Sequence, residues 1–137
     1  MSGTLPPELG YLTTLEELII ERNVLLVGPI PSTFSKLTSL RKLLFRFNNL
    51  EGPWSEGLLD NMTDLDKLDL AYNDFNMTLP RDIGKRTSLE ELDFAGNKIH
   101  GSIPSEYGRL YKLSKSSYCI IFSTMYNFNT FSRGPIE

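Results

Sequence analysis

Four asparagines recur at nearly constant spacing along this chain, and each closes the same pattern of apolar residues. Asn23, Asn48, Asn73 and Asn97 are separated by 25, 25 and 24 residues (48−23, 73−48 and 97−73). Each stands in a segment of the form L-x-x-L-x-L-x-x-N-x-L, in which Ile or Phe replaces Leu at some positions. A unit of this length used four times predicts a solenoid, in which each coil buries its apolar residues against its neighbours.

The stretch before each asparagine has the period of a β-strand. In the first copy Leu18 and Ile20 are two residues apart, which indicates a short strand with alternate side chains turned inward. Leu15 and Leu25 flank that strand, and we expect both to point into the core. Because each coil contributes one strand, successive strands are predicted to lie side by side and parallel.

The recurring asparagine is interpreted as a structural residue. Its side-chain amide both donates and accepts hydrogen bonds, so it can pair backbone groups of adjacent coils that would otherwise be buried without partners. We therefore assign Asn23, Asn48, Asn73 and Asn97 to a structural ladder rather than to ligand contacts.

A second phrase fills the other half of each unit. It reads GTLPPELGYL at 3–12, GPIPSTFSKL at 28–37 and GSIPSEYGRL at 101–110. The two phrases together resemble the plant-type leucine-rich repeat family, whose motif is similar to L-x-x-L-x-x-L-x-L-x-x-N-x-L-x-G-x-I-P-x-x-L-G-x. The resemblance covers residues 3–113. It implies an α/β-type repeat solenoid, a right-handed superhelix with a concave parallel sheet inside and loops or short 3₁₀ turns outside.

Several copies depart from the phrase, always outside the strand. Repeat one has an extra residue between Asn23 and Gly28, and repeat two has one within residues 58–62. Trp54 stands where Ile is expected, and Arg86 stands where Leu is expected. Insertions are tolerated in loops, so we expect the coils to close with an irregular outer face.

The repeats define the expected domain organisation. Residues 1–113 are predicted to form the solenoid, with a partial repeat at 3–12 followed by four repeats. In residues 114–137 the pattern fades, and this segment is a degenerate last repeat, an improvised cap or a non-native tail. We interpret the chain as a piece of a longer repeat protein, because it begins within a repeat and shows no polar capping unit.

Composition narrows the function classes. The net charge of −3 argues against general nucleic-acid binding. No apolar stretch reaches the roughly 18 residues that a membrane-spanning helix needs. Cys119 is the only cysteine, which excludes an internal disulfide. The family resemblance implies paired-cysteine caps in extracellular members, so either such caps lie outside this segment or the protein works in a reducing compartment.

Two sequons bear on the compartment. They begin at Asn61 and Asn76, each followed by Met and Thr, and both are expected on the loop side of the coil. That placement suits a glycoprotein whose strands remain bare. The localisation is therefore extracellular or at the cell membrane if the parent is receptor-like, and otherwise cytoplasmic.

The strand face supplies the candidate binding residues. Ile19 and Leu44 are apolar residues expected to face water, and Phe47 and Tyr72 are aromatics at equivalent positions of adjacent coils. Exposed aromatic and Arg residues that cluster on a sheet are typical of an interaction site. With the acidic residues that would attract a basic partner, the predicted partner-binding set is Ile19, Arg22, Leu44, Arg46, Phe47, Asp69, Tyr72 and Asp93.

The sequence supplies little for catalysis. Asp69 and Asp93 share a ladder position and could approach the 5–5.5 Å spacing of a retaining glycosidase, but an open sheet surface cannot desolvate an acid. His100 and Cys119 have no catalytic partners nearby in sequence, and no metal-ligand spacing appears. We therefore predict no enzyme, no cofactor and no metal.

The function predicted from the sequence is binding of a protein or peptide. The resemblance implies a module of a receptor-like protein or receptor kinase ectodomain, in signalling or defence recognition, and it allows for a parent protein that is anchored in a membrane. Nucleic acid is not expected as a partner. The alternatives are a structural or intracellular scaffold and an inhibitor of a secreted enzyme.

Overall fold

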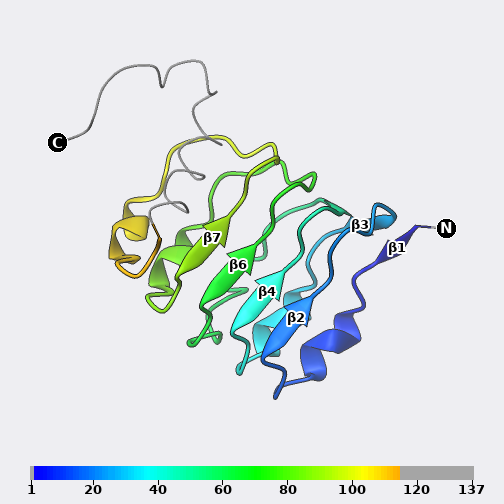
Figure 1. Ribbon diagram of the computed structural model, residues 1–137, viewed down its shortest axis with the longest axis horizontal. Helices are drawn as coiled ribbons and strands as arrows, with labels where there is room; N and C mark the ends of the chain where they lie inside the picture. Colours follow the sequence, from blue (N-terminus) through cyan, green and yellow to red (C-terminus); the bar gives the residue numbers. More distant parts are fainter. Residues whose placement is uncertain (1, 115–137) are drawn as a thin grey trace.

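The computed structural model describes residues 2–114, which form a stack of coils with one parallel sheet along one side (Figure 1). This sheet contains β2 (Glu17–Ile19), β4 (Lys42–Leu44), β6 (Lys67–Asp69) and β7 (Glu91–Asp93), in that spatial order. Each strand comes from one copy of the asparagine-terminated segment. The predicted leucine-rich repeat solenoid is confirmed.

The register of the sheet places equivalent residues of successive coils directly opposite one another. Leu18 pairs with Leu43, Leu43 with Leu68, and Leu68 with Leu92. These four leucines are buried and form the floor of the sheet. Side chains on either side of the leucine row point to the opposite, solvent-facing side, because successive residues of a strand alternate. That side is called the strand face below.

Short 3₁₀ turns lie away from the strand face. They are η1 (Pro7–Tyr11), η2 (Ser32–Lys36), η3 (Arg81–Lys85) and η4 (Ser105–Arg109). Each follows the proline of the second phrase, whose fixed φ favours entry into a turn and whose missing N–H leaves no donor unsatisfied. Repeat two has no such turn helix: Trp54-Ser55 replaces Ile-Pro, and residues 56–61 form irregular turns.

A second, smaller parallel sheet was not predicted from the sequence. It contains β1 (Gly3–Thr4), β3 (Leu26–Gly28) and β5 (Asn49–Leu50), in the order β1-β3-β5. A single bridge between Thr78 and His100 continues the same pattern in later coils. After each asparagine the chain runs extended beside the preceding coil, so backbone groups on this side find partners between coils rather than in water.

The core fills the space between the two sheets and the turns. Its largest side chains are four phenylalanines from different coils, all completely buried: Phe34, Phe45, Phe75 and Phe94. Phe34 and Phe45 pack as a tilted aromatic pair with ring centroids 6.3 Å apart. The strand leucines surround these rings, so each coil contributes apolar surface that only its neighbours can cover.

The repeated asparagines connect each coil to the one before it. Asn48, Asn73 and Asn97 each accept a backbone N–H of the preceding coil at 2.8–3.1 Å. Each also donates to a carbonyl of that coil at 2.7–2.8 Å. Asn23 differs: it is exposed, and its amide donates to the nearby carbonyl of Glu21. The hydrogen bonds between coils that we expected of the asparagine side chains are thus present at Asn48, Asn73 and Asn97, whereas the Asn23 side chain bonds only within its own coil.

The expectation that Leu25 points into the core was wrong. Leu25 is 59% exposed, whereas Leu26 lies against the core and begins strand β3. The extra residue between Asn23 and Gly28 explains the shift, because the chain must return to the common register by Gly28. Val24 and Leu25 are pushed outward as a small loop, closed by a hydrogen bond from the Leu26 N–H to the Asn23 carbonyl at 2.9 Å.

Two departures from the repeat phrase compensate each other. The insertion in repeat two leaves the carbonyls of Leu59 and Asp60 inside an irregular turn. The buried Arg86 of the next coil donates to these carbonyls at 3.0 and 3.1 Å. In the same way, Trp54 donates its indole N–H at 3.1 Å to Asp82, which is buried in η3. Polar residues therefore replace apolar ones where the irregular coil needs hydrogen-bond donors or acceptors.

Most of the predicted tail lies outside the residues that the structure describes. Apart from Ser114, the segment 114–137 lies outside the described residues, as does Cys119. Among the described residues, no helix has the length and apolar character needed to cross a bilayer.

Candidate binding face

One ladder of residues follows the carboxyl ends of the strands, immediately before each asparagine. It consists of Arg22, Phe47, Tyr72 and Gly96, and it is called the stacked ladder below. All four residues have the left-handed backbone conformation, with φ of 61°, 58°, 55° and 67°. This conformation costs about 1–3 kcal/mol for a residue with a side chain, so its recurrence indicates that the turn into the asparagine imposes it.

The side chains of the stacked ladder lie one upon another. The rings of Phe47 and Tyr72 have centroids 4.6 Å apart and planes 8° from parallel. The guanidinium of Arg22 lies 5.0 Å from the Phe47 ring centroid. Gly96 ends the stack, since a Cβ there would lie 2.5 Å from the Tyr72 ring. Phe47 is 37% exposed and Tyr72 is 47% exposed, so the stack presents aromatic surface to solvent.

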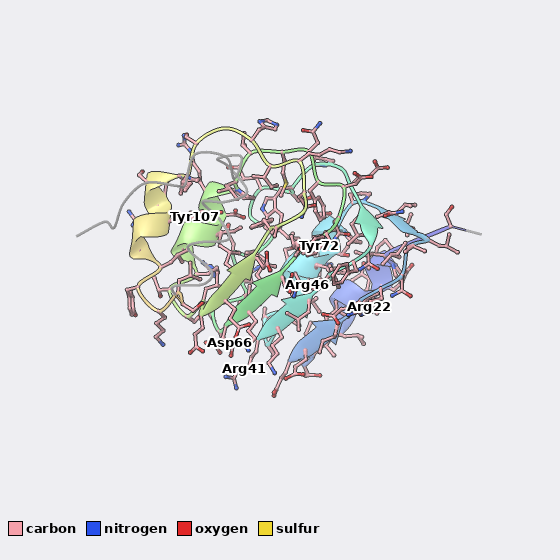
Figure 2. The ribbon with its side chains drawn as sticks, turned by 45° about the horizontal axis from the view of Figure 1, so that its top comes forward. Arg22, Arg41, Arg46, Asp66, Tyr72 and Tyr107 are labelled. Carbon is pink, nitrogen blue, oxygen red and sulfur yellow. The ribbon has the colours of Figure 1, made fainter. Side chains whose placement is uncertain are left out.

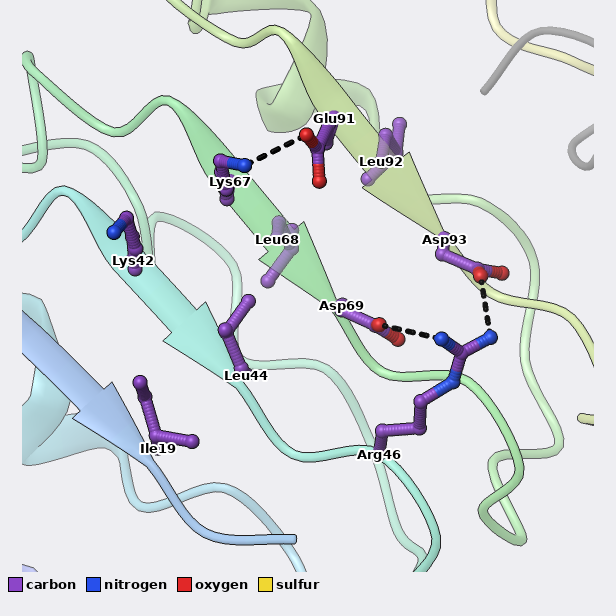
Figure 3. A pocket seen from close by; sticks show the side chains of 10 residues that line it. All are labelled: Ile19, Lys42, Leu44, Arg46, Lys67, Leu68, Asp69, Glu91, Leu92 and Asp93. Carbon is purple, nitrogen blue, oxygen red and sulfur yellow. Dashed lines mark hydrogen bonds and ion pairs between the residues drawn. The ribbon is translucent and has the colours of Figure 1, made fainter. Parts of the chain in front are cut away.

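Arg46 connects the stacked ladder to two carboxylates. Its guanidinium nitrogens lie 3.5 Å from Asp69 Oδ2 and 3.2 Å from Asp93 Oδ2 (Figure 3). The same guanidinium lies 5.5 Å from the Phe47 ring centroid and 5.6 Å from the Tyr72 ring centroid. Arg46 thus ties three coils together and holds the aromatic pair from one side.

The second oxygen of each carboxylate binds the backbone. Asp69 Oδ1 accepts the Ala71 N–H at 2.9 Å, and Asp93 Oδ1 accepts the Ala95 N–H at 2.8 Å. The expectation that this open sheet surface cannot desolvate an acid was wrong for Asp69, because burial raises its pKa. The Ala71 N–H lowers that pKa, the neighbouring Asp93 raises it and Arg46 lowers it. Glu21 also raises the pKa of Asp69. Because guanidinium and backbone donors occupy both carboxylates, neither is placed as a free general acid.

An apolar step lies beside the carboxylates on the strand face. Ile19 pairs with Leu44, Leu44 with Asp69, and Asp69 with Asp93, so these four residues form one row across the sheet. Ile19 is 50% exposed and Leu44 is half-buried. The row lines a shallow hollow of about 330 Å³, whose other walls are charged side chains (Figure 3).

The remaining strand-face charges mostly form lateral ion pairs. Lys42 Nζ lies 2.6 Å from Glu17, and Lys67 Nζ lies 2.7 Å from Glu91. A third pair joins Arg41 to Asp66 at 2.9 Å, near the amino ends of the strands and away from Arg22, Arg46 and Tyr72 (Figure 2). Exposed pairs of this kind contribute little to stability because solvent screens them, so they mainly keep neighbouring coils in register.

The structure places the predicted site residues in three connected groups on the strand face. Ile19 and Leu44 form the apolar step; Arg46, Asp69 and Asp93 form an ion-paired cluster; and Arg22, Phe47 and Tyr72 belong to the stacked ladder. Sequence reasoning missed the role of Gly96, which leaves room for the Tyr72 ring. It also missed the electrostatic influence of Glu21 on Asp69. The change from Phe and Tyr to Gly at one ladder position was the available signal for the former.

The two sequons lie outside the strand face. Asn61 is exposed in the irregular turns of repeat two, and its amide donates to the Ser35 carbonyl at 3.1 Å. Asn76 is exposed after strand β6. In residues 2–114, no group of three or more His, Cys, Asp or Glu side chains is arranged to hold a metal ion.

Comparison with known proteins agrees with this architecture. The Leucine Rich Repeat family model matches residues 88–110. Receptor-like protein 39 of Arabidopsis thaliana is 38% identical over 77 residues, which are 56% of this chain and 8% of that protein. The chain has the leucine-rich repeat fold and is similar to plant receptor-like proteins.

Solved ectodomains show the same coils. The leucine-rich repeat ectodomain of the Arabidopsis thaliana receptor kinase GASSHO1/SCHENGEN3, in complex with CASPARIAN STRIP INTEGRITY FACTOR 2, superposes with a TM-score of 0.78 and 35% identity over 82% of this chain. The Arabidopsis receptor kinase HAESA, in complex with the peptide hormone IDA and the co-receptor SERK1, gives a TM-score of 0.77 and 33% identity over 82%.

The leucine-rich repeat chain is short beside these relatives. It spans 13% of the GASSHO1/SCHENGEN3 chain and 18% of the HAESA chain, in addition to 8% of Receptor-like protein 39. It therefore matches a few adjacent coils of much longer solenoids.

Proposed function

We propose that this chain is a protein- or peptide-binding module of a receptor-like protein that acts in signalling or defence recognition. The observation that carries the proposal is the exposed stack of Phe47 and Tyr72, held between Arg22 and Arg46 on the strand face. Rigid aromatic and Arg side chains contribute a large share of the binding energy at protein interfaces. A stack fixed before binding loses little conformational entropy when a partner arrives.

The relatives support the same class of function. HAESA was solved with a peptide hormone and a co-receptor, and the similar coils here offer a comparable open sheet. We propose the same eight partner-binding residues as the sequence did, centred on the stacked ladder. A scaffold or an inhibitor of a secreted enzyme would also use a binding surface, but the receptor-like relatives favour the receptor assignment.

Selection from a random-peptide display library tests the proposal. Peptides enriched on the chain should lose enrichment on the Phe47→Ala/Tyr72→Ala double variant. Tyr11→Ala is the matched control: Tyr11 is an exposed aromatic with the Lys36 ammonium 4.5 Å from its ring centroid, but it lies in η1 rather than on the strand face. Enrichment that is lost equally in the control, or retained in the double variant, would reject the strand face as the binding surface.

We also propose that the parent protein faces the extracellular side and that Asn61 and Asn76 carry N-linked glycans. Both sequons project from the coil away from the strands, so glycans would leave the strand face open. Expression behind a secretion signal in plant cells, followed by mass spectrometry of the peptides around each site, tests this directly. Asn61→Gln and Asn76→Gln should each remove one glycan; unmodified asparagines in the secreted chain would refute the assignment.

A further inference from the structure

Two coils of the strand face carry an aspartate where the two coils before them carry an apolar residue. Asp69 on β6 and Asp93 on β7 occupy the row positions of Ile19 and Leu44. Both carboxylates turn toward the guanidinium of Arg46, which comes from the coil of β4 (Figure 3). Adjacent parallel strands lie about 4.8 Å apart, so the two carboxylates are close neighbours. They are called the carboxylate pair below.

The carboxylate pair is bonded to the backbone turns that precede the stacked ladder. Asp69 Oδ1 accepts the N–H of Ala71 at 2.9 Å, and Asp93 Oδ1 accepts the N–H of Ala95 at 2.8 Å. Ala71 directly precedes Tyr72, whose φ is 55°. A hydrogen bond to an ionised carboxylate is roughly twice as strong as one to a neutral acceptor. The negative charge of Asp69 therefore stabilises the left-handed turn from which the Tyr72 ring projects.

The other oxygens of the carboxylate pair orient Arg46. One terminal nitrogen lies 3.5 Å from Asp69 Oδ2, and the other lies 3.2 Å from Asp93 Oδ2. Arg46 Nε is buried, and no atom of the described residues accepts a hydrogen bond from it. The two carboxylates thus fix the direction of this guanidinium, 5.5 Å from the Phe47 ring centroid and 5.6 Å from the Tyr72 ring centroid. Asp69 therefore acts on the aromatic stack twice, through this guanidinium and through the turn before Tyr72.

The carboxylate pair and its guanidinium carry more negative than positive charge. Two carboxylates and one guanidinium sum to a formal charge of −1 (−2+1), and a proton on one carboxyl group makes the sum zero. Burial raises the pKa of Asp69, and the charges of Asp93 and Glu21 raise it too, whereas the Ala71 N–H and Arg46 lower it. Because the causes that raise this pKa prevail, Asp69 takes up a proton at a higher pH than an ordinary aspartate does.

Two lysines on the strand face are engaged by glutamates. Lys42 Nζ lies 2.6 Å from Glu17, and Lys67 Nζ lies 2.7 Å from Glu91. The largest electrostatic influences on the pKa of Asp69 are instead Asp93, Arg46 and Glu21. By strand, the charged side chains around Asp69 are Glu21 after β2, Lys42 and Arg46 of the β4 coil, Lys67 on β6, and Glu91 and Asp93 on β7.

We propose that Asp69 positions the stack of Phe47 and Tyr72 and that a proton on its carboxyl group releases the stack. A protonated carboxyl group has no charge to attract Arg46, so the guanidinium pairs with Asp93 alone and moves away from the rings. The protonated group is also the weaker acceptor for the backbone N–H before Tyr72, so that turn loosens. This inference rests on the proposed function, because it assigns a regulation to the same face: the stack is set for binding when Asp69 is ionised.

A pH titration followed by NMR tests the positioning without any partner. The carboxyl carbon of Asp69, the Nε–H of Arg46 and the two stacked rings should shift with one common midpoint, above the ordinary aspartate pKa of 3.8. In Asp69→Asn this transition should be absent, and at neutral pH the ring signals should match the acidic end of the wild-type titration. Asp74→Asn, which removes an exposed carboxylate outside the hollow, is the control and should keep the transition.

Ring signals that do not follow the Asp69 carboxyl group in the wild-type chain would overturn the inference. A transition that survives in Asp69→Asn would overturn it as well. If this variant fails to fold, the wild-type titration and the next variant decide.

Asp93→Asn tests whether the two carboxylates share Arg46. This substitution removes the neighbouring negative charge and leaves the guanidinium to Asp69, so the Asp69 midpoint should move to lower pH. The signals of Arg46 and of the two rings should move with it. An unchanged or higher Asp69 midpoint, or ring signals that keep the wild-type midpoint, would contradict the inference.

The pH dependence of binding tests the link between positioning and recognition. Amidated peptides from the library selection that contain no Asp, Glu or His are the probes, because their own charge stays constant as Asp69 titrates. One pH unit below the Asp69 midpoint about a tenth of these carboxyl groups remain ionised, so affinity should fall up to about tenfold relative to neutral pH. Asp69→Asn should bind weakly at both pH values. Wild-type affinity that does not change with pH would overturn the proposed regulation.

The two measurements separate this inference from the proposed function. Rings that follow Asp69 in a chain that captures no peptide would reject the proposed function and leave the positioning role standing. Peptides that require Phe47 and Tyr72 but bind equally above and below the Asp69 midpoint would overturn the inference and leave the proposed function standing.

Discussion

The ring of Phe47 lies flat on the ring of Tyr72, with the centroids 4.6 Å apart and the planes 8° from parallel. The two residues occupy the same position in neighbouring coils, 25 residues apart in sequence (72−47). Their separation equals the spacing of adjacent strands, about 4.8 Å. The stacking of coils therefore produces an aligned pair of exposed aromatic side chains without any further adjustment of the backbone.

The aromatic pair should be coupled energetically but should not be required for folding. In a double-mutant cycle of Phe47→Ala and Tyr72→Ala, we expect a coupling energy of about 0.5–1.5 kcal/mol, because both rings are partly exposed and stacked. Urea unfolding monitored by circular dichroism measures it. If the double variant loses its native spectrum, or more than about 3 kcal/mol of unfolding free energy, the rings are core residues and not a recognition surface.

Gly96 should be sensitive to the smallest substitution. In Gly96→Ala, the added Cβ would lie 2.5 Å from the Tyr72 ring and the residue would keep a φ of 67°, so we expect the unfolding free energy to fall by about 1–3 kcal/mol. In a Tyr72→Ala background the steric part of this cost should disappear. Gly3→Ala is the control, because nothing lies within 4 Å of its added Cβ; equal losses at both glycines would contradict the account.

Two adjacent leucines in repeat one should differ in how much stability they lose on truncation to Ala. Leu25→Ala should change the unfolding free energy by no more than about 0.5 kcal/mol because Leu25 is exposed, whereas Leu26→Ala should cost about 1–2 kcal/mol because Leu26 packs on the core. Leu68→Ala, in the buried leucine row, should cost about 2–5 kcal/mol. Thermal and urea unfolding of the three variants measure these losses. A larger loss for Leu25→Ala than for Leu26→Ala would show that Leu25, and not Leu26, packs on the core.

Restoring the family leucine at position 86 should destabilise the protein. Arg86→Leu removes the donors to the Leu59 and Asp60 carbonyls and leaves the buried Leu59 carbonyl without this partner, at a cost of about 1–3 kcal/mol in unfolding free energy. Equilibrium urea unfolding measures the change. An unchanged or higher stability would show that the turn recruits other donors, such as water.

Asp69 should titrate above the range of an ordinary aspartate. Its folded pKa is raised, chiefly by burial, so its ionised form costs stability at neutral pH. That cost fades as pH falls through the folded pKa and is gone below the unfolded pKa of 3.8. On acidification the protein should therefore gain stability relative to Asp69→Asn. Carboxyl NMR titration gives the direction, and an Asp69 pKa below that of an unfolded peptide would contradict it.

The fold could be predicted from the sequence because every coil repeats the same short pattern, so the structure of one coil predicts the others. Leu18, Leu43, Leu68 and Leu92 occupy equivalent positions in copies of one segment, and the buried row they form follows from that equivalence. Insertions broke the rule only locally. The repeat pattern assigns the inward position to the second residue after Asn23, which is Leu25. Because one residue is inserted before Gly28, Leu26 takes that position instead.

The sequence predicted which residues share the candidate site but not how their side chains contact one another. Residues at equivalent ladder positions had to share the strand face, so Phe47 and Tyr72 could be paired from spacing alone. The ion-pair partners of Arg46 could not be predicted from spacing. Glu21 occupies the equivalent position of the preceding coil, 25 residues earlier (46−21), but Arg46 reaches the two carboxylates of the following coils, at distances of 3.5 and 3.2 Å.

The sequence by itself determined the number of strands in the larger sheet, their parallel order and the side chains that face solvent, because all three follow from the spacing of the asparagines and leucines. Tertiary structure alone decided which long side chains pair, where Leu25 points and how Arg86 is satisfied. The partners of Arg46 and Arg86 lie 23 to 47 residues away in sequence (69−46 and 93−46), so the pattern within one coil does not specify them. The direction of Leu25 follows from the extra residue before Gly28.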